Sequence, residues 1–236
     1  MIYTERPLPQ KLLDNLRDKE TDHNYRAMIQ SIAWSLIETE HIPGVVAVLG
    51  TGTGRTSAWI GEILDIIGSK KRLLLFDAFP VAPIHPDETL VDVCVDCNYD
   101  TGIADVDNAF DALETKRARE YVPGWFKDTV KTKLPPASFV YVDVPNRSSL
   151  LSMLHELYMA LADGSVCLFE GYGLGLTACV QRQTDAFLLL RPEKMENTVS
   201  GIQGGFVRQV PQWLKDEQAA AAKRVKNKPL PPTEVQ

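Results

Sequence analysis

Four short runs of almost continuous apolar residues limit most strongly what this chain can fold into. They lie at residues 45–49 (VVAVL), 72–77 (RLLLFD), 138–144 (SFVYVDV) and 165–170 (SVCLFE). Strands that are covered by helices on both faces, as in a parallel sheet, have this composition. Helix-like segments separate the runs, and this alternation predicts an α/β fold with a doubly wound sheet.

Apolar residues at helical spacing mark the segments between these strands. Gly68 is expected at the C′ position that ends one helix, and Ser148 at the N-cap that begins another. The predicted helices span residues 22–40, 54–67, 105–119, 149–161 and 177–190, and a hairpin is predicted at 195–210. Ligands of such sheets bind beyond the carboxyl ends of the strands, so the residues that follow each strand form the candidate site.

Charge and hydropathy narrow the classes of partner. The chain has 236 residues and a net charge of −6 at pH 7. Nucleic acids and anionic membranes bind basic surfaces, so neither is an expected partner. The sequence has no run of about 20 apolar residues that would span a bilayer. Its charged N-terminal segment lacks the apolar centre of a signal peptide, so we expect a cytoplasmic protein.

The first apolar run leads directly into a glycine-rich stretch, GTGTGR, with glycines at positions 50, 52 and 54. A strand that ends in glycines before a helix brings bare backbone and the helix N-terminus toward a ligand. The dinucleotide fingerprint G-x-G-x-x-G would require its third glycine at the position of Arg55. This spacing disfavours a nicotinamide dinucleotide, and the alternative without any ligand is a plain tight turn.

The second apolar run ends in Asp77. A carboxylate at the carboxyl end of the neighbouring strand can accept hydrogen bonds from both hydroxyls of a ribose. The alternative is an aspartate that caps a following helix. The glycine stretch and Asp77, in this order, favour a nucleoside ligand.

Several segments together resemble the macrocin O-methyltransferase (TylF/MycF-type) family of the class I S-adenosylmethionine (SAM)-dependent methyltransferases. The resemblance covers roughly residues 40–210, and its segments include IPGVVAVLGTGTGRTS, LLLFDAFP, YVPGWFKDTV, LPPASFVYVDV and TDAFL, in this order. It implies a Rossmann-like class I methyltransferase fold, with a mostly parallel seven-stranded sheet and helices on both faces. It also implies three parts: a helical cap at 1–40, the methyltransferase domain at 41–212, and a helix with a flexible proline-rich tail at 213–236.

The resemblance also implies a set of residues that bind SAM. The glycines would line its methionine portion, Asp77 would hold the ribose, and Gly124, Trp125 and Phe126 would flank the adenine. The full implied set is Gly50, Thr51, Gly52, Gly54, Ser57, Asp77, Ala78, Phe79, Gly124, Trp125, Phe126 and Asp143. One departure is Val48, because the family usually has an acidic residue two positions before the first glycine.

A second departure concerns the metal that the family uses. Its members bind magnesium through aspartates after the fourth and fifth strands, where this chain has Asp143 and Glu170 alone. These two carboxylates would hold magnesium if water and substrate supplied the other ligands. Without a metal, a base must act alone or the acceptor must be more acidic. Asp143 or Glu170 is the predicted base, and Tyr172 is predicted to position the acceptor.

Three functions follow from these residues. The first is a SAM-dependent O-methyltransferase that acts on a small-molecule hydroxyl in secondary metabolism, and we expect a homodimer because similar proteins form one. The second is a SAM-binding homologue that has lost its metal site and either catalyses another reaction or is not catalytic. The third is a nicotinamide-dependent oxidoreductase, which the glycine spacing and the lack of a Tyr-x-x-x-Lys pair disfavour.

Overall fold

The computed structural model describes residues 7–79, 101–144 and 146–217 of the chain. The predicted tail beyond residue 217 lies outside the described residues. Residues 212–217, which open the predicted C-terminal segment, are helical.

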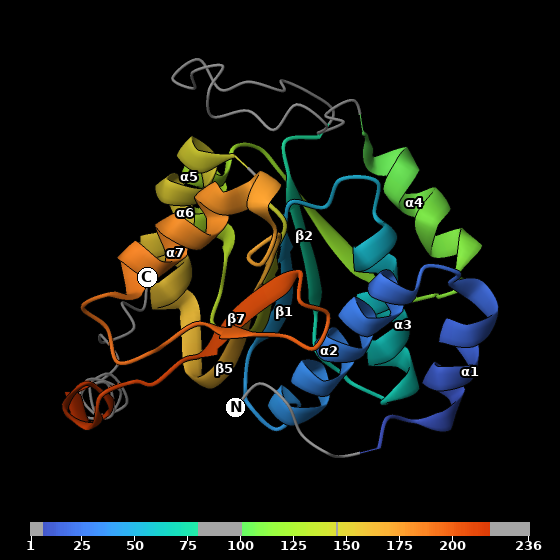
Figure 1. The fold of residues 1–236 in the computed structure, drawn as a ribbon, viewed down its shortest axis with the longest axis horizontal. Coiled ribbons are helices and arrows are strands. Elements are labelled where there is room, and N and C mark those ends of the chain that lie inside the picture. Colours follow the sequence, from blue (N-terminus) through green and yellow to red (C-terminus); the bar gives the residue numbers. More distant parts are fainter. Residues whose placement is uncertain (1–6, 80–100, 145, 218–236) are drawn as a thin grey trace, which may run out of the picture.

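A seven-stranded sheet forms the centre of the molecule, in the order β3-β2-β1-β4-β5-β7-β6 (Figure 1). Strands β1 to β5 pair in parallel, whereas β7 runs antiparallel to both β5 and β6. This arrangement confirms the mostly parallel seven-stranded sheet. The strands are β1 (Val45–Leu49), β2 (Leu73–Asp77), β3 (Arg119–Pro123), β4 (Ala137–Val142), β5 (Leu161–Glu170), β6 (Glu196–Asn197) and β7 (Gln203–Val207).

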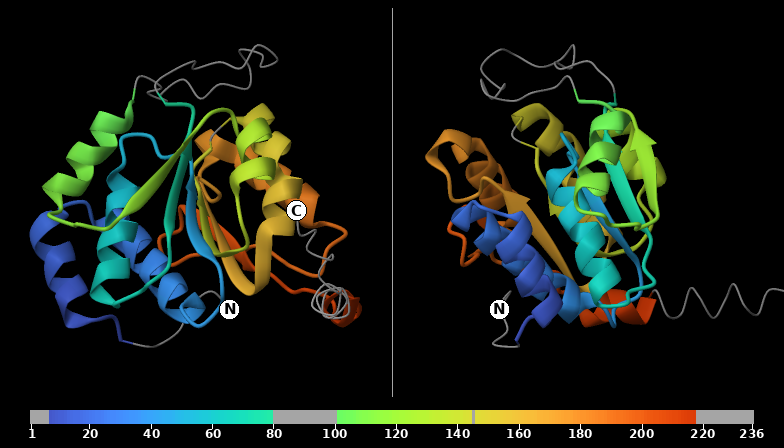
Figure 2. Two further views of the ribbon diagram at one scale, coloured as in Figure 1. Left: turned by 180° about the vertical axis from the view of Figure 1, so that it is seen from behind. Right: turned by 90° about the vertical axis from the view of Figure 1, so that its right-hand side faces the viewer.

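Helices cover both faces of the sheet, and the two faces are best seen in Figures 1 and 2. One face, here called the α1–α4 face, is packed under α1 (Gln10–Lys19), α2 (His23–Thr39), α3 (Arg55–Ile66) and α4 (Ile103–Ala112). The other, the α5–α7 face, is packed under α5 (Phe126–Lys133), α6 (Arg147–Ala160) and α7 (Ala178–Leu188). A short 3₁₀ helix, Gly175–Thr177, precedes α7.

Side chains alternate between these two faces along each central strand. Val46 and Val48 of β1 belong to the hydrophobic cluster of the α1–α4 face, whereas Val45, Ala47 and Leu49 belong to the other. All five are buried, as the apolar run predicted. Consecutive strand residues point to opposite faces, so a strand covered on both sides needs apolar residues at every position.

The predicted helix at 105–119 is wrong at its C-terminal end. Helix α4 ends at Ala112, and Glu114 has a left-handed φ of 59°, which breaks the helical path. Arg117 then donates to the backbone carbonyl of Ser69 at 2.8 Å, which ties this segment to the loop after α3. The predicted helix is therefore absent over residues 113–118, and the chain is extended as β3 from Arg119 onward.

The start of α6 also differs from the prediction. Asn146, not Ser148, is the N-cap, and its side chain accepts a hydrogen bond from the backbone N–H of Ser149 at 3.3 Å. Gly68 lies just beyond α3 with a φ of 68°, as predicted for a C′ glycine.

The N-terminal helices are integral to the α1–α4 face. Helix α2 packs against α3, β4 and β5, and α1 packs against α3. Leu12 and Leu16 of α1 are in the same hydrophobic cluster as the strands. The domain boundary near residue 40 stays a prediction. Among the described residues, no helix has both the length and the apolar character that crossing a bilayer requires.

Candidate functional site

The glycine loop after β1 leaves one glycine facing open space. Gly50, Gly52 and Gly54 have φ values of 88°, 51° and 84°, a region that favours glycine. A Cβ on Gly50 would lie 2.0 Å from the carbonyl oxygen of Asp143, and one on Gly54 would lie 2.7 Å from the Cα of Val106. A Cβ on Gly52 would meet nothing within 4 Å. Packing within the protein therefore accounts for Gly50 and Gly54, and Gly52 is where a ligand can approach the backbone.

Asp77 shapes this loop from the end of β2. One of its oxygens, Oδ2, accepts the backbone N–H groups of Thr51 at 2.7 Å and Gly52 at 2.9 Å. The other, Oδ1, accepts the N–H of Ala78 at 2.7 Å. A carboxylate offers about four lone-pair sites, so capacity remains for a ligand hydroxyl. The contact with a ribose stays a prediction, and the loop interaction is a role that sequence reasoning missed.

The ends of β2 and β3 lie side by side, where the adenine was predicted. The N–H of Gly124 donates to the backbone carbonyl of Asp77 at 2.9 Å. Phe79 packs edge-on against Tyr121 of β3, with ring centroids 5.7 Å apart. Trp125 and Phe126 are half-buried at the start of α5. The fold therefore gathers these residues at one edge of the sheet, and their contact with adenine stays a prediction.

Two residues of the predicted cofactor set, one in the glycine loop and one just after it, are buried. Thr51 is 6% exposed, and Ser57 in the first turn of α3 is fully buried. The hydroxyl of Ser57 has no hydrogen-bond partner within the described part of the chain. Its position brings a polar atom close behind the loop, and its contact with SAM stays a prediction.

The carboxylates of Asp143 and Glu170 lie at the carboxyl ends of the adjacent parallel strands β4 and β5. Asp143 is open to solvent, and Glu170 is half-buried. The surrounding protein, together with the negative charges of Glu170 and Asp77, raises the pKa of Asp143. Burial raises the pKa of Glu170, although the Tyr141 hydrogen bond and the charge of Arg55 act in the opposite direction. Groups of this kind suit the removal of a proton from a substrate.

Two buried polar residues that the sequence reasoning missed support Glu170. The hydroxyl of Tyr141 in β4 donates to a carboxylate oxygen of Glu170. Gln203 of β7 donates its amide N–H to the Tyr141 oxygen at 3.1 Å. Both residues are fully buried. The signal for Tyr141 was a hydroxyl inside the apolar run SFVYVDV, whereas Gln203 becomes visible only once β7 is placed opposite β5.

The structure does not bring Tyr172 together with Asp143 and Glu170. Its side chain belongs to the cluster of the α5–α7 face, where its ring packs against Gly204. Its hydroxyl donates to Asp185 of α7 at 2.6 Å. Burial and the Asp185 carboxylate raise the pKa of Tyr172 to about 12. Tyr141, on the opposite face, is the tyrosine that contacts Glu170, and the role of Tyr172 in positioning the acceptor stays a prediction.

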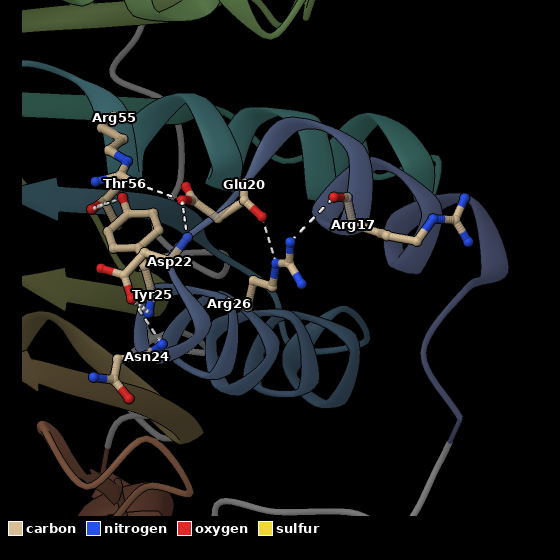
Figure 3. A network of polar contacts seen from close by, with 8 residues as sticks. All are labelled: Arg17, Glu20, Asp22, Asn24, Tyr25, Arg26, Arg55 and Thr56. Carbon is tan, nitrogen blue, oxygen red and sulfur yellow. Dashed lines mark hydrogen bonds and ion pairs between the residues drawn. The ribbon is translucent and has the colours of Figure 1, made fainter.

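A polar network fastens the N-terminal helices to the glycine loop (Figure 3). Arg55, the first residue of α3, donates to the buried carboxylate of Glu20 at 2.5 Å and lies 3.8 Å from the ring centroid of Tyr25. The Tyr25 hydroxyl shares a hydrogen bond of 2.8 Å with Thr56. Asp22 caps α2 by accepting the N–H of Tyr25. The first turn of α2 is thereby held at the start of α3, beside the loop.

The residues present do not fit the predicted magnesium site. In residues 7–79, 101–144 and 146–217, no three His, Cys, Asp or Glu side chains gather where they could hold a metal ion. One oxygen of Glu170 is already engaged by Tyr141. Val48 stands where the resembling family has an acid; it is 1% exposed and lies opposite Tyr141 in the sheet. The prediction of magnesium at Asp143 and Glu170 is therefore not supported.

Comparisons with known proteins bear on the fold. No protein-family model matches the chain, and no curated protein sequence does. The structure is similar to that of the O-methyltransferase NovP, with a TM-score of 0.65 and 16% identity over 78% of this chain and 81% of that one. It is also similar to CalS11, a calicheamicin methyltransferase, with a TM-score of 0.65 and 16% identity over 86% and 87% of the two chains.

A third similar structure contains a bound cofactor. It is the O-methyltransferase TomG from Streptomyces achromogenes, which is involved in tomaymycin synthesis and was solved in complex with SAM. The TM-score is 0.50 and the identity 13%, over 86% of this chain and 89% of that one. At such identities the likeness establishes the fold, which is the Rossmann-like fold of these methyltransferases.

Proposed function

We propose that this protein is a SAM-dependent O-methyltransferase that acts on the hydroxyl group of a small molecule. The observation that carries the proposal is the meeting of three features at one edge of the sheet. These are the open backbone at Gly52, the aspartate that ends β2, and the carboxylates that end β4 and β5. The similar structures NovP, CalS11 and TomG, each named a methyltransferase, support the same activity.

The reaction requires alignment and the removal of one proton. The acceptor oxygen attacks the methyl carbon of the sulfonium, the carbon–sulfur bond breaks, and S-adenosylhomocysteine leaves with the electron pair on sulfur. The hydroxyl proton passes to a carboxylate of the pair Asp143 and Glu170, which acts as the general base. Because no step passes through a metal, an acceptor more acidic than an alkyl alcohol, such as a phenol, suits this site best.

The acceptor class has separate support. The net charge of −6 disfavours nucleic acid as the acceptor. NovP, CalS11 and TomG are O-methyltransferases, and two of them are named for calicheamicin and tomaymycin, so we include a role in natural-product tailoring in the proposal. Cytoplasmic location, a homodimer, and membership of the macrocin O-methyltransferase family belong to the same proposal. The alternative is a SAM-binding homologue with a different reaction, which the departures at Val48 and at the metal positions favour.

Thermal unfolding with SAM, S-adenosylhomocysteine and NAD tests the cofactor. A ligand at about 100 times its Kd stabilises the folded protein by roughly 2.7 kcal/mol. We expect this stabilisation with the two sulfur nucleosides and none with NAD. Stabilisation by NAD alone, or by none of the three, would refute the proposal.

A matched pair of glycine variants locates the binding site. Gly52 and Gly68 both have positive φ and both face open space, but Gly68 lies beyond the far end of α3. Gly52→Val and Gly68→Val carry a similar backbone strain. We expect Gly52→Val alone to abolish S-adenosylhomocysteine binding in calorimetry. Equal binding by the two variants would place the ligand elsewhere.

Methyl transfer separates the enzyme from a non-catalytic homologue. The protein is incubated with methyl-labelled SAM and a panel of phenols, catechols and sugars, and labelled product is counted. We expect transfer to a phenolic member, and we expect Asp143→Asn and Glu170→Gln each to reduce it while S-adenosylhomocysteine binding persists. Binding without transfer to any panel member favours the alternative.

A further inference from the structure

Tyr141, Gln203 and Thr198 form a chain of hydrogen bonds that ends on Glu170. We propose that these three are positioning residues, which hold the Glu170 carboxylate in one orientation so that its second oxygen faces the acceptor hydroxyl. The inference rests on the proposed function, because it assigns the residues that prepare the general base of that reaction.

All donors in the chain point in one direction. The hydroxyl of Thr198 donates to the side-chain oxygen of Gln203 at 3.4 Å, while Ser200 donates to the Thr198 oxygen in a shorter hydrogen bond of 2.7 Å. The amide nitrogen of Gln203 therefore faces the Tyr141 oxygen, to which it donates at 3.1 Å. Tyr141 has a single hydroxyl hydrogen, and it is directed to Glu170. The sulfur of Met28 lies 3.6 Å from the same hydroxyl but is a much weaker acceptor than a carboxylate.

Two of these three residues lie in the central sheet, and Thr198 lies in the segment between β6 and β7. Tyr141 is in β4, Gln203 is in β7, and both strands flank β5, which ends in Glu170. Gln203 is the direct cross-strand partner of Glu170. Tyr141 and Gln203 are fully buried, and Thr198 is 5% exposed. Residues held by a sheet keep a catalytic group in place better than loop residues do.

The remaining neighbours of Glu170 leave its other oxygen available. The groups that act on it electrostatically from other elements are Tyr25 of α2, Arg55 of α3 and Asp143 after β4. Arg55 is paired with Glu20, and Tyr25 is bonded to Thr56. Among the described residues, Tyr141 alone forms a hydrogen bond with the Glu170 side chain. One oxygen is thus committed to the protein, and the other is left for a substrate.

A second tyrosine–glutamate pair supplies a matched control. On the α5–α7 face, the hydroxyl of Tyr158 donates to Glu193 at 2.9 Å. Tyr158→Phe removes a buried hydroxyl from a glutamate just as Tyr141→Phe does, but away from the glycine loop. A loss caused only by a weaker fold would therefore appear in both variants.

Crystal structures of both variants with S-adenosylhomocysteine give the first readout, which needs no acceptor. We expect the Glu170 carboxylate to rotate or to occupy several conformers in Tyr141→Phe, and to keep its orientation in Tyr158→Phe. An unchanged Glu170 in Tyr141→Phe would overturn the inference. Failure of the wild-type protein to bind S-adenosylhomocysteine would instead refute the proposed function.

Kinetics give the second readout, with the phenol that the wild-type protein methylates fastest in the panel above. We expect kcat of Tyr141→Phe to fall on the order of 100-fold, the loss that about 1 Å of misplacement causes, with KM for the phenol unchanged. Tyr158→Phe should retain the wild-type kcat. An equal fall in the two variants, or a change confined to KM, would contradict a positioning role.

Discussion

The two buried tyrosine–glutamate pairs differ in how the glutamate's charge is balanced. Glu193 forms an ion pair of 2.7 Å with Arg208 and also accepts the backbone N–H of Gln209, and its side chain is 0% exposed. Arg208 in turn lies 3.8 Å from the ring centroid of Tyr158. Glu170 has no ion pair with a lysine or arginine among the described residues, and a second carboxylate, Asp143, follows the adjacent strand β4.

This difference separates a structural site from a reactive one. The carboxylate of Glu193 accepts hydrogen bonds from Tyr158, Arg208 and the backbone of Gln209, so it has no oxygen available to bind a substrate. Around Glu170 a single tyrosine fixes the group, and the charge of Glu170 helps to raise the pKa of the neighbouring Asp143. A polar group that is only partly satisfied at the end of a strand costs stability, and such costs are typical of functional sites.

The largest expected effect comes from removing the cation of the closed pair. Arg208→Met leaves Glu193 charged and buried, and should lower the free energy of unfolding by about 3–5 kcal/mol. Denaturant unfolding measures this loss. Arg72→Met, which breaks an exposed pair with Glu120, is the control and should cost less than about 1 kcal/mol. Equal losses would mean that Glu193 is no better balanced than a surface carboxylate.

A smaller effect is expected from removing either tyrosine hydroxyl. Tyr158→Phe and Tyr141→Phe should each lower the free energy of unfolding by about 1–2 kcal/mol, because each leaves a buried hydrogen-bonding group without its partner. If the two variants are equally stable but only Tyr141→Phe loses methyl transfer, the difference between the two pairs is one of function and not of stability. If Tyr141→Phe lost several times more stability than Tyr158→Phe, the pair of Tyr141 and Glu170 would also be needed for the stability of the fold.

The smallest effect concerns pH. The pKa of Asp143 is raised in the folded protein, so its ionisation disfavours folding. Protonated Asp143 therefore contributes stability at acid pH. This stability is lost as the pH rises from the ordinary aspartate pKa of about 3.9 through the raised pKa of the folded protein. Asp143→Asn should be more stable than the wild-type protein at pH 8 and equal to it near pH 4. Because Asp143 is open to solvent, the gain should stay below about 1 kcal/mol. A variant that is less stable at pH 8 would contradict the sign.

Sequence patterns predicted the sheet better than the site. The apolar runs that became β1, β2, β4 and β5 showed their burial in their composition, whereas β3 (REYVP) is an edge strand that includes the exposed Glu120 and was not predicted. The carboxylates at strand ends follow from topology and were found. The contact of Gln203 with Tyr141 depends on the pairing of β7 with β5. A glycine is needed at position 54 because a Cβ there would collide with Val106 of α4. Neither contact has a local signal.

The network around Arg55 has a practical consequence for anyone who shortens the protein. A version that began at residue 22 would retain every strand and the whole glycine stretch. It would nevertheless discard Glu20, which pairs with the arginine that opens α3, and the backbone carbonyls of Glu20 and Arg17 that receive the Arg26 guanidinium. Helix α1 and the residues that follow it thus support the glycine loop, and removing them would loosen the backbone at Gly52, where a ligand can approach.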